Sequence, residues 1–367
     1  MITMVKLWGN CGDFGCWVGE LPTGCKLCKK GLKSVVFLTG LCSESCFYCP
    51  VSNERRGRDV TYINDELVNN FDELISEVKA CGSRGVGITG GEPLLRFSRL
   101  IQVIKVLKEN FSTGFHIHLY TSGKQLTESM LKELVNVGLD ELRIHPVDEV
   151  SIKVLKKVVT KFVGSLSLGI EVPAIPGRFE WLKGLVLMAN DLGLEFVNMN
   201  ELEVSESNVD ELIMRGYRPS AERFMSAEGS HETALRVIEW VMNEGLSITV
   251  HYCPAIFKDR YQYRLRMILR GLNTKRPHEV LTTEGTLLYI RTDIRTYISL
   301  SKELRKVCIK GNNVYLNVCD VLNDESLLKE LVGRAYVVEA YPTKVRRVLN
   351  EVPIEDFNAN EYVVMRC

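Results

Sequence analysis

Seven short apolar runs alternate with helical patterns between residue 33 and about residue 253, and this alternation restricts the fold more than any other feature. The runs cover residues 34–40, 85–90, 115–122, 141–146, 167–174, 196–203 and 247–254. In the segments between them apolar residues recur every three or four positions, which is the spacing of an amphipathic helix. Alternating strands and helices build βαβ units, so the strands are expected to form one parallel sheet.

Polar residues follow these strands, and they favour a barrel over a doubly wound sheet. In a (β/α) barrel the loops after the strands build the active site at one end, so polar side chains gather there. Seven strands fall short of a complete barrel. The sequence therefore predicts an α/β fold with a partial, incomplete (β/α) TIM-like barrel over residues 33–256.

Both ends of the chain lie outside this alternation. Residues 1–32 are rich in glycine and cysteine without a clear period, so they are expected to form a loop-built metal-binding segment. A basic connecting helix is expected at 257–276. Shorter strands and one helix then predict a small α+β domain at 277–367.

Charge and hydropathy exclude several classes of protein. The formal net charge is zero, so bulk charge favours neither nucleic acid nor a membrane as partner. No apolar run is long enough to span a bilayer, and no early segment resembles a signal peptide. The twelve cysteines gather at metal-ligand spacings, which indicates a reducing, cytoplasmic location.

Three cysteines, Cys42, Cys46 and Cys49, follow the first predicted strand directly. Tetrahedral zinc and common iron–sulfur clusters take four protein ligands, so three thiolates leave one place open. One interpretation is a four-iron cluster whose fourth iron binds a small molecule. The other is a zinc site that a further residue completes.

The spacing C-x3-C-x2-C, with Tyr48 before its last cysteine, resembles the signature of the radical S-adenosylmethionine (SAM) superfamily. Gly90, Gly91 and Glu92 follow the second strand and resemble the GGE motif of that family. The resemblance implies that the three cysteines hold a 4Fe–4S cluster, that SAM chelates the open iron, and that the GGE motif contacts the methionine part of SAM. It also implies reductive cleavage of SAM to a 5′-deoxyadenosyl radical, with a reductant such as ferredoxin or flavodoxin.

Other strand ends carry further candidate contacts to SAM. Thr121 and Ser122 resemble the family's TNG-like turn after the third strand. Glu171 lies in a segment that resembles the fifth strand of the activase-like branch, where a strand residue contacts the adenosine, although a structural ion pair is an alternative. Asn198, on the sixth strand, is a further candidate.

Four more polar residues at strand ends are candidates for catalysis or substrate binding. His145 closes the fourth strand, where it either transfers a proton or serves as a hydrogen-bonded structural histidine. Cys253 follows the last strand and is expected to donate a hydrogen atom, to ligate iron or merely to pack. Asn200 and Glu201 lie in a polar cluster that does not suit a buried strand, so they are predicted to line a substrate cavity.

Cys11, Cys16, Cys25 and Cys28 form a second cysteine quartet. Four thiolates suit a closed zinc site that would fold a segment with little core of its own. They equally suit a second 4Fe–4S cluster, and disulfides or free thiols are the third possibility.

The stretch 257–276 contains seven Lys or Arg residues with tyrosines between them. Such a pattern favours phosphate contact and base stacking, and it makes Arg260, Arg264 and Arg266 candidate RNA contacts. The alternative is an amphipathic helix whose basic face is solvated or paired with acids.

The sequence thus predicts a radical SAM enzyme that modifies a macromolecule, either RNA or protein. One alternative is an activase that places a glycyl radical on a partner enzyme, because the barrel resembles that branch. Another is a non-catalytic metal or electron-transfer protein, which would not need the GGE motif.

Overall fold

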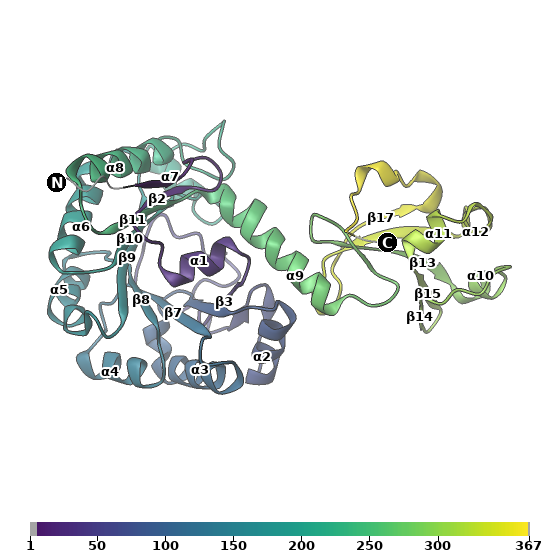
Figure 1. The fold of residues 1–367 in the computed structure, drawn as a ribbon, viewed down its shortest axis with the longest axis horizontal. Helices are drawn as coiled ribbons and strands as arrows, with labels where there is room; N and C mark the ends of the chain where they lie inside the picture. The colour runs from purple at the N-terminus through teal and green to yellow at the C-terminus, as the bar shows by residue number, and fades with distance from the viewer. Residues whose placement is uncertain (1–5, 366–367) are drawn as a thin grey trace. The chain divides into compact units, whose positions relative to one another are not determined.

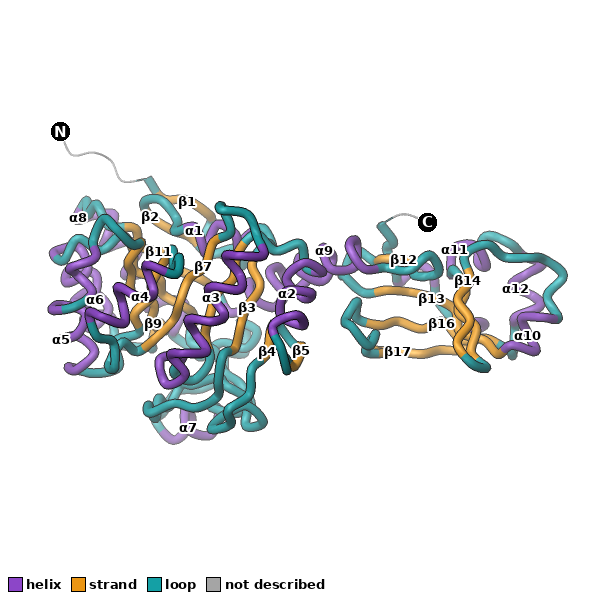
Figure 2. Tube along the Cα trace, turned by 90° about the horizontal axis from the view of Figure 1, so that it is seen from below, coloured by secondary structure: helices purple, strands orange, loops and turns teal. Residues whose placement is uncertain are grey.

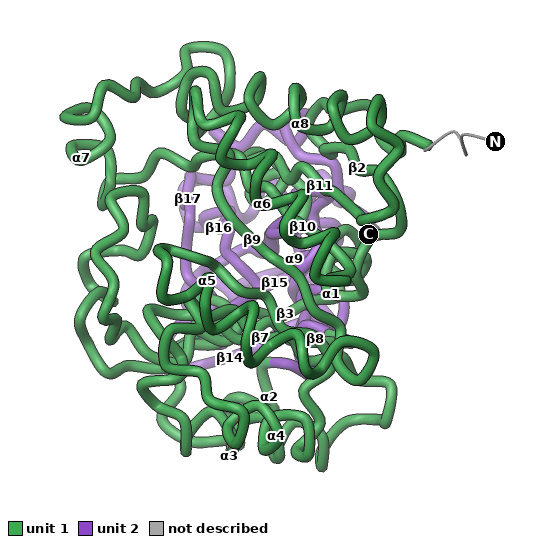
Figure 3. Tube along the Cα trace, turned by 90° about the vertical axis from the view of Figure 1, so that its left-hand side faces the viewer, with its two compact units in different colours: residues 1–77, 83–262 green, residues 78–82, 263–367 purple. Residues whose placement is uncertain are grey.

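The computed structural model describes residues 6–365, which form two compact units (Figure 3). The first comprises residues 83–262 and the described residues up to Glu77. The second comprises Val78–Gly82 and the described residues from Tyr263 onward. Within residues 6–365, no helix combines the length and the apolar character needed to cross a bilayer.

The first unit is built on a sheet whose seven central strands are parallel and adjacent in chain order. They are β3 (Lys33–Phe37), β6 (Gly85–Thr89), β7 (His116–Thr121), β8 (Glu141–Ile144), β9 (Ser167–Ala174), β10 (Phe196–Glu201) and β11 (Thr249–Cys253). Each matches one of the seven predicted runs, and only β3 extends beyond its run, by one residue at Lys33. The strand order runs from one edge to the other without closing, so the predicted incomplete barrel is confirmed.

Helices cover the outer side of the curved sheet (Figure 1). They are α3 (Phe97–Asn110), α4 (Glu128–Asn136), α5 (Glu149–Lys157), α6 (Phe179–Asp191) and α8 (Ser230–Glu244), with α2 (Phe71–Ala80) beside β3. Leu100, Ile104 and Leu107 of α3 are fully buried, as the three- and four-residue spacing predicts. A further short helix, α7 (Val209–Met214), follows β10.

Two antiparallel hairpins extend the sheet at its edges. β4 (Tyr62–Ile63) and β5 (Glu66–Leu67) add to β3, although the pattern from residue 64 predicts a helix. Asn64 adopts a positive φ of 53°, which forms a tight turn there, and the helix starts only at Phe71.

The other hairpin comes from the N-terminal segment. β1 (Leu7–Gly9) pairs with β2 (Cys16–Val18), and β2 pairs with β11. The helix α1 (Thr23–Lys29) lies on the inner side of the barrel sheet (Figure 1). Where the sequence predicts a separate metal-binding segment over residues 1–32, the described part is integrated into the barrel unit, because Cys16 and Val18 are fully buried in its core.

The second unit is a six-stranded antiparallel sheet with short helices (Figure 2). Its strands are β12 (Val280–Leu281), β13 (Leu287–Asp293), β14 (Val307–Lys310), β15 (Asn313–Leu316), β16 (Ala335–Ala340) and β17 (Val348–Pro353). Its helices are α9 (Arg264–Thr274), α10 (Ile294–Ile298), α11 (Val318–Leu322) and α12 (Glu325–Leu331). Side chains of α11 and α12 pack on β13 and β15 in a core of their own, and the unit has the predicted α+β composition.

Candidate active site

The loop after β3 carries three free thiols. Cys42 is exposed, whereas Cys46 and Cys49 are half-buried. The Cys49 N–H donates to the Cys46 carbonyl at 3.1 Å, which folds this part of the loop into a turn. Burial raises the pKa of the Cys42 and Cys46 thiols. Three soft sulfur donors on one short loop suit an iron–sulfur cluster.

The GGE motif lies directly against this loop. The N–H of Gly91 donates to the Thr39 carbonyl at 2.7 Å, and that of Glu92 to the Leu41 carbonyl at 2.8 Å. A Cβ atom on Gly91 would lie 2.3 Å from the Leu41 carbonyl oxygen and 3.0 Å from the Cys42 Cβ. Only glycine allows so close an approach, so the motif fits the place that a cluster and SAM would require.

The Glu92 carboxylate joins this motif to the turn after β7. It is 2% exposed and accepts hydrogen bonds from the Thr121 hydroxyl at 2.6 Å, the Ser122 N–H at 2.9 Å and the Ser122 hydroxyl at 2.7 Å. Three residues predicted to contact SAM are therefore in mutual contact. The fit between the cysteine loop and these groups supports a shared cofactor site.

Tyr48 and His145 form a hydrogen-bonded pair beside the cysteines. The Tyr48 hydroxyl lies 2.9 Å from His145 Nε2, and His145 Nδ1 lies 2.8 Å from the backbone oxygen of Glu171. A carbonyl oxygen only accepts, so Nδ1 carries the hydrogen and Nε2 accepts from Tyr48. Burial lowers the pKa of His145 and raises that of Tyr48. The imidazole is neutral with both nitrogens engaged, and its proton-transfer role stays a prediction.

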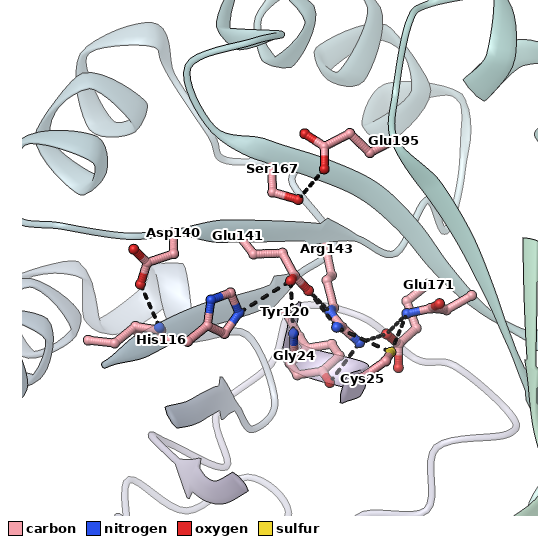
Figure 4. A network of polar contacts seen from close by, with 12 residues as sticks. Gly24, Cys25, His116, Tyr120, Asp140, Glu141, Arg143, Ser167, Glu171 and Glu195 are labelled. Atoms are coloured by element: carbon pink, nitrogen blue, oxygen red, sulfur yellow. Dashed lines mark hydrogen bonds and ion pairs between the residues drawn. The ribbon is translucent and has the colours of Figure 1, made fainter. Parts of the chain in front are cut away.

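Arg143 is the centre of a buried polar network inside the barrel (Figure 4). Its side chain is 2% exposed. Its Nε donates to Glu141 at 2.6 Å, and its Nη1 donates to Glu171 at 2.6 Å and to the Tyr120 hydroxyl at 3.2 Å. Its Nη2 reaches the Cys25 sulfur at 3.5 Å. Sequence reasoning missed this residue, although the alternation Glu141-x-Arg143 places two charges on one face of β8.

Glu171 belongs to the same network, as the ion-pair alternative predicts. Besides Arg143 it accepts hydrogen bonds from the side-chain amides of Asn198 at 3.0 Å and Asn200 at 2.9 Å. Burial opposes its ionisation, but Arg143 and the two amides outweigh this effect and hold the pKa of Glu171 below its usual value. The predicted contacts of Glu171 and Asn198 with SAM stay predictions.

A cavity of about 290 Å³ opens beside this network within the barrel unit. Asn200, Glu171 and Cys253 line it, together with Cys25 and Cys28 of α1. Lys258 of the basic stretch lines it too, and residues that sequence reasoning missed complete the lining, among them Lys29, Lys33, Tyr120, Arg143 and His251. The alternation His251-x-Cys253 on β11 could have indicated two of these side chains on one face.

The predicted quartet of metal-binding cysteines does not form. Cys11 and Cys16 are joined by a disulfide, whereas Cys25 and Cys28 are free thiols. Cys11 and Cys16 lie at the two ends of one tight turn before β2, and this turn brings their side chains together. Cys25 and Cys28 instead lie on α1 and line the barrel cavity.

The prediction that Glu201 lines the cavity is also wrong. Its side chain is 1% exposed and pairs with Arg223, and it accepts hydrogen bonds from the Ser226 hydroxyl and the Ala255 N–H, both at 2.8 Å. Burial opposes its ionisation, but these partners hold the pKa of Glu201 below its usual value. The carboxylate is engaged in fixing two loops and is not among the residues that line the cavity.

The three candidate RNA contacts of the basic stretch do not form one solvated basic face. Arg260 is exposed, but Arg264 pairs with Glu284 at 3.2 Å and Arg266 is only 7% exposed. Lys258 pairs with Glu203 at 3.2 Å. The ion pairs of Arg264 and Lys258 agree with the alternative in which the basic residues pair with acids. The sequence does not predict the burial of Arg266, which lies on the buried side of α9 with Met267.

His116, His118 and Glu141 bring their ligand atoms within 4.8 Å of one another. Glu141 already accepts hydrogen bonds from Arg143 and, at 3.1 Å, from the N–H of Gly24. A buried guanidinium on the same carboxylate repels a cation, so this group is better explained as a structural network.

An incomplete (β/α) barrel with three thiols after its first parallel strand and a GGE motif after the second defines a class of SAM-dependent iron–sulfur enzymes. Residues 36–161 match the Radical SAM superfamily. A protein of Methanocaldococcus jannaschii, provisionally named a glycyl-radical enzyme activating enzyme, is 37% identical over 91% of this chain and 93% of its own length. The chain belongs to the radical SAM superfamily.

Among solved structures, SuiB of Streptococcus suis bound to precursor peptide SuiA matches with a TM-score of 0.43 and 11% identity. That match covers 63% of this chain and 50% of SuiB, so the chain spans about half the length of that protein. anSMEcpe with bound SAM matches with a TM-score of 0.40 and 12% identity, over 69% of this chain and 72% of that one. Membership of the radical SAM superfamily, which the family match and the 37% identical relative show, makes the chain a radical SAM enzyme with a 4Fe–4S cluster and SAM as its cofactors.

Proposed function

We propose that the substrate of this enzyme is a protein, and that the enzyme activates a partner by removing a hydrogen atom from the Cα of a glycine. The name of the Methanocaldococcus jannaschii relative supports this proposal, because the match covers 93% of that protein. The burial of Arg266 and the ion pairs of Arg264 and Lys258 weaken the case for RNA.

The proposed site combines the cysteine loop with the GGE motif and the turn after β7. Cys42, Cys46 and Cys49 hold the cluster, and the GGE motif with Thr121 and Ser122 binds the methionine part of SAM. When bound, the cluster and SAM together supply a 5′-deoxyadenosyl radical. A reductant such as ferredoxin or flavodoxin provides the electron.

The chain's own residues shape this site. His145 accepts the hydrogen bond of Tyr48 and fixes that ring beside the cysteines. Thr121 and Ser122 hold the Glu92 carboxylate in one orientation at the end of the barrel. Such fixed, buried polar groups orient a ligand without rearrangement.

The proposal is tested with glycine-centred peptides deuterated at the glycine Cα. The reduced enzyme is incubated anaerobically with SAM and each peptide, and 5′-deoxyadenosine is analysed by mass spectrometry. We expect peptide-stimulated product that contains one deuterium, because the hydrogen atom that leaves the glycine enters the 5′ methyl group.

Peptides with alanine at the centre are the matched control, and the Cys46→Ala enzyme should form no product. Total RNA is assayed in parallel. If RNA stimulated the formation of 5′-deoxyadenosine and no peptide transferred deuterium, the proposal of a protein substrate would be wrong. The substrate would then be a nucleic acid.

A further inference from the structure

Three cysteines converge on the barrel cavity from two distant parts of the chain. Cys25 and Cys28 lie three residues apart on α1, so both can face the same side of that helix. Cys253 ends β11, and all three side chains line the same cavity. Each is a free thiol. None belongs to the loop that carries Cys42, Cys46 and Cys49.

His251 adds a fourth donor to the same wall. It lies two positions before Cys253 on β11, so both side chains face the barrel interior. Asn198 determines its tautomer: the amide nitrogen of Asn198 donates to Glu171 at 3.0 Å and to the Cys25 sulfur at 3.4 Å, which turns the amide oxygen toward His251 Nδ1 at 3.3 Å. Nδ1 therefore carries the hydrogen, and the lone pair is on Nε2.

This Nε2 atom has no hydrogen-bond partner among the described residues, and the His251 side chain is 3% exposed. Burying a polar atom without a partner costs free energy, so a ligand that pairs with this atom in the cavity would remove that cost. A histidine that donates through one nitrogen and offers the other is typical of a metal ligand with an outer hydrogen-bond acceptor.

The charges around the cavity favour an anionic occupant. Four cationic side chains line it, those of Lys29, Lys33, Arg143 and Lys258, against the single carboxylate of Glu171. Glu171 already pairs with Arg143, and Lys258 pairs with Glu203, so positive charge is in excess at Lys29 and Lys33. Thiolates bound to a metal centre would supply the missing negative charge.

The spacing of the thiols distinguishes a cluster from a single ion. Sulfur ligands of one Zn²⁺ lie roughly 4 Å apart, given a Zn–S bond of about 2.3 Å. Within residues 6–365, only His116, His118 and Glu141 place three ligand atoms within 4.8 Å of one another. Cys25, Cys28 and Cys253 therefore do not all lie within 4.8 Å of one another, which suits thiolates that bind different irons better than ligands of one Zn²⁺. Arg143 and Asn198 also donate to the Cys25 sulfur, which is typical of cluster ligands.

We propose that Cys25, Cys28 and Cys253, with His251 as the fourth ligand, hold a second iron–sulfur cluster inside the barrel. All four of its irons have protein ligands, so this cluster is closed to SAM. The proposal of this second cluster does not depend on the identity of the substrate.

The test removes the first cluster and counts the iron that remains. The full-length variant Cys42→Ala/Cys46→Ala/Cys49→Ala is reconstituted anaerobically with iron and sulfide. We expect about four irons per chain and a cluster EPR signal after reduction with dithionite. Adding Cys25→Ala and Cys28→Ala should remove nearly all of this iron. Adding Cys308→Ala, which changes a free thiol of the second unit, should leave it in place.

Circular dichroism confirms that each variant is folded. Adding Cys253→Ser to the parent variant is a milder test of iron binding, because it changes only one atom at a strand end. Adding His251→Ala should keep iron but alter the EPR signal. The proposal is overturned if the parent variant binds no iron, if it binds zinc in place of iron, or if the iron survives loss of Cys25, Cys28 and Cys253. SAM cleavage is not measured, so the outcome is independent of the proposed reaction.

Discussion

Gly91 is the residue at which the backbone of the GGE motif is closest to the cysteine loop. In Gly91→Ala the new methyl group would lie 2.3 Å from the Leu41 carbonyl oxygen, and neither backbone segment can easily yield. We expect a loss of stability of about 1–3 kcal/mol and a marked loss of iron bound at Cys42, Cys46 and Cys49. Urea unfolding and iron analysis measure the two effects.

Gly184→Ala is the matched control, because Gly184 lies within α6 and nothing approaches its Cβ position within 4 Å. Alanine there should stabilise the helix by up to about 1 kcal/mol. Equal behaviour of the two variants would contradict the close approach at Gly91.

The Tyr48 hydroxyl is the donor that satisfies His145 Nε2. Tyr48→Phe keeps the ring but leaves this half-buried nitrogen unpaired, which should cost about 1–3 kcal/mol of the free energy of unfolding. Chemical denaturation of the apo proteins measures the loss. Tyr217→Phe changes a half-buried tyrosine that packs on Phe47 and should alter stability by less than about 0.5 kcal/mol. If Tyr48→Phe were equally neutral, the hydrogen bond would not hold in solution.

Among the elements, the parallel strands could be predicted because each is a local apolar run. The placement of α1 could not, since it depends on contacts with strands far along the chain, such as the hydrogen bond from the Gly24 N–H to Glu141. For the same reason the sequence grouped Cys25 and Cys28 with Cys11 and Cys16, their neighbours in the chain. Cys25 and Cys253 line the same cavity because β2 pairs with β11 and so brings the N-terminal segment to the barrel. This pairing joins residues that are far apart in the chain.

The layer between α1 and strands β7 and β8 buries His118 completely. Burial, together with the positive charges of Arg143 and Lys33, holds the pKa of His118 well below its usual value, although Glu141 opposes the shift. Below about pH 6.5 the unfolded chain therefore takes up a proton that the folded one does not. Stability should fall as the pH drops, by up to about 1.4 kcal/mol per pH unit for this group.

His118→Gln removes this titration. Denaturant midpoints of the wild type and the variant, measured between pH 7.5 and pH 5.5, should show a shallower fall for the variant, by about 1 kcal/mol over this range. Absolute stabilities can differ, because the comparison uses only the slopes. Parallel curves would mean that the imidazole is protonated in the folded barrel.

For the whole molecule, the two units have separate cores and are expected to unfold in separate transitions. Leu316 is fully buried in the core of the second unit. All four tryptophans, Trp8, Trp17, Trp181 and Trp240, belong to the first unit, so tryptophan fluorescence follows the barrel alone. Leu316→Ala should lower the stability of the second unit by about 2–5 kcal/mol. This should move part of the circular dichroism transition while the fluorescence midpoint stays unchanged. A matching shift in fluorescence would show that the two units unfold as one.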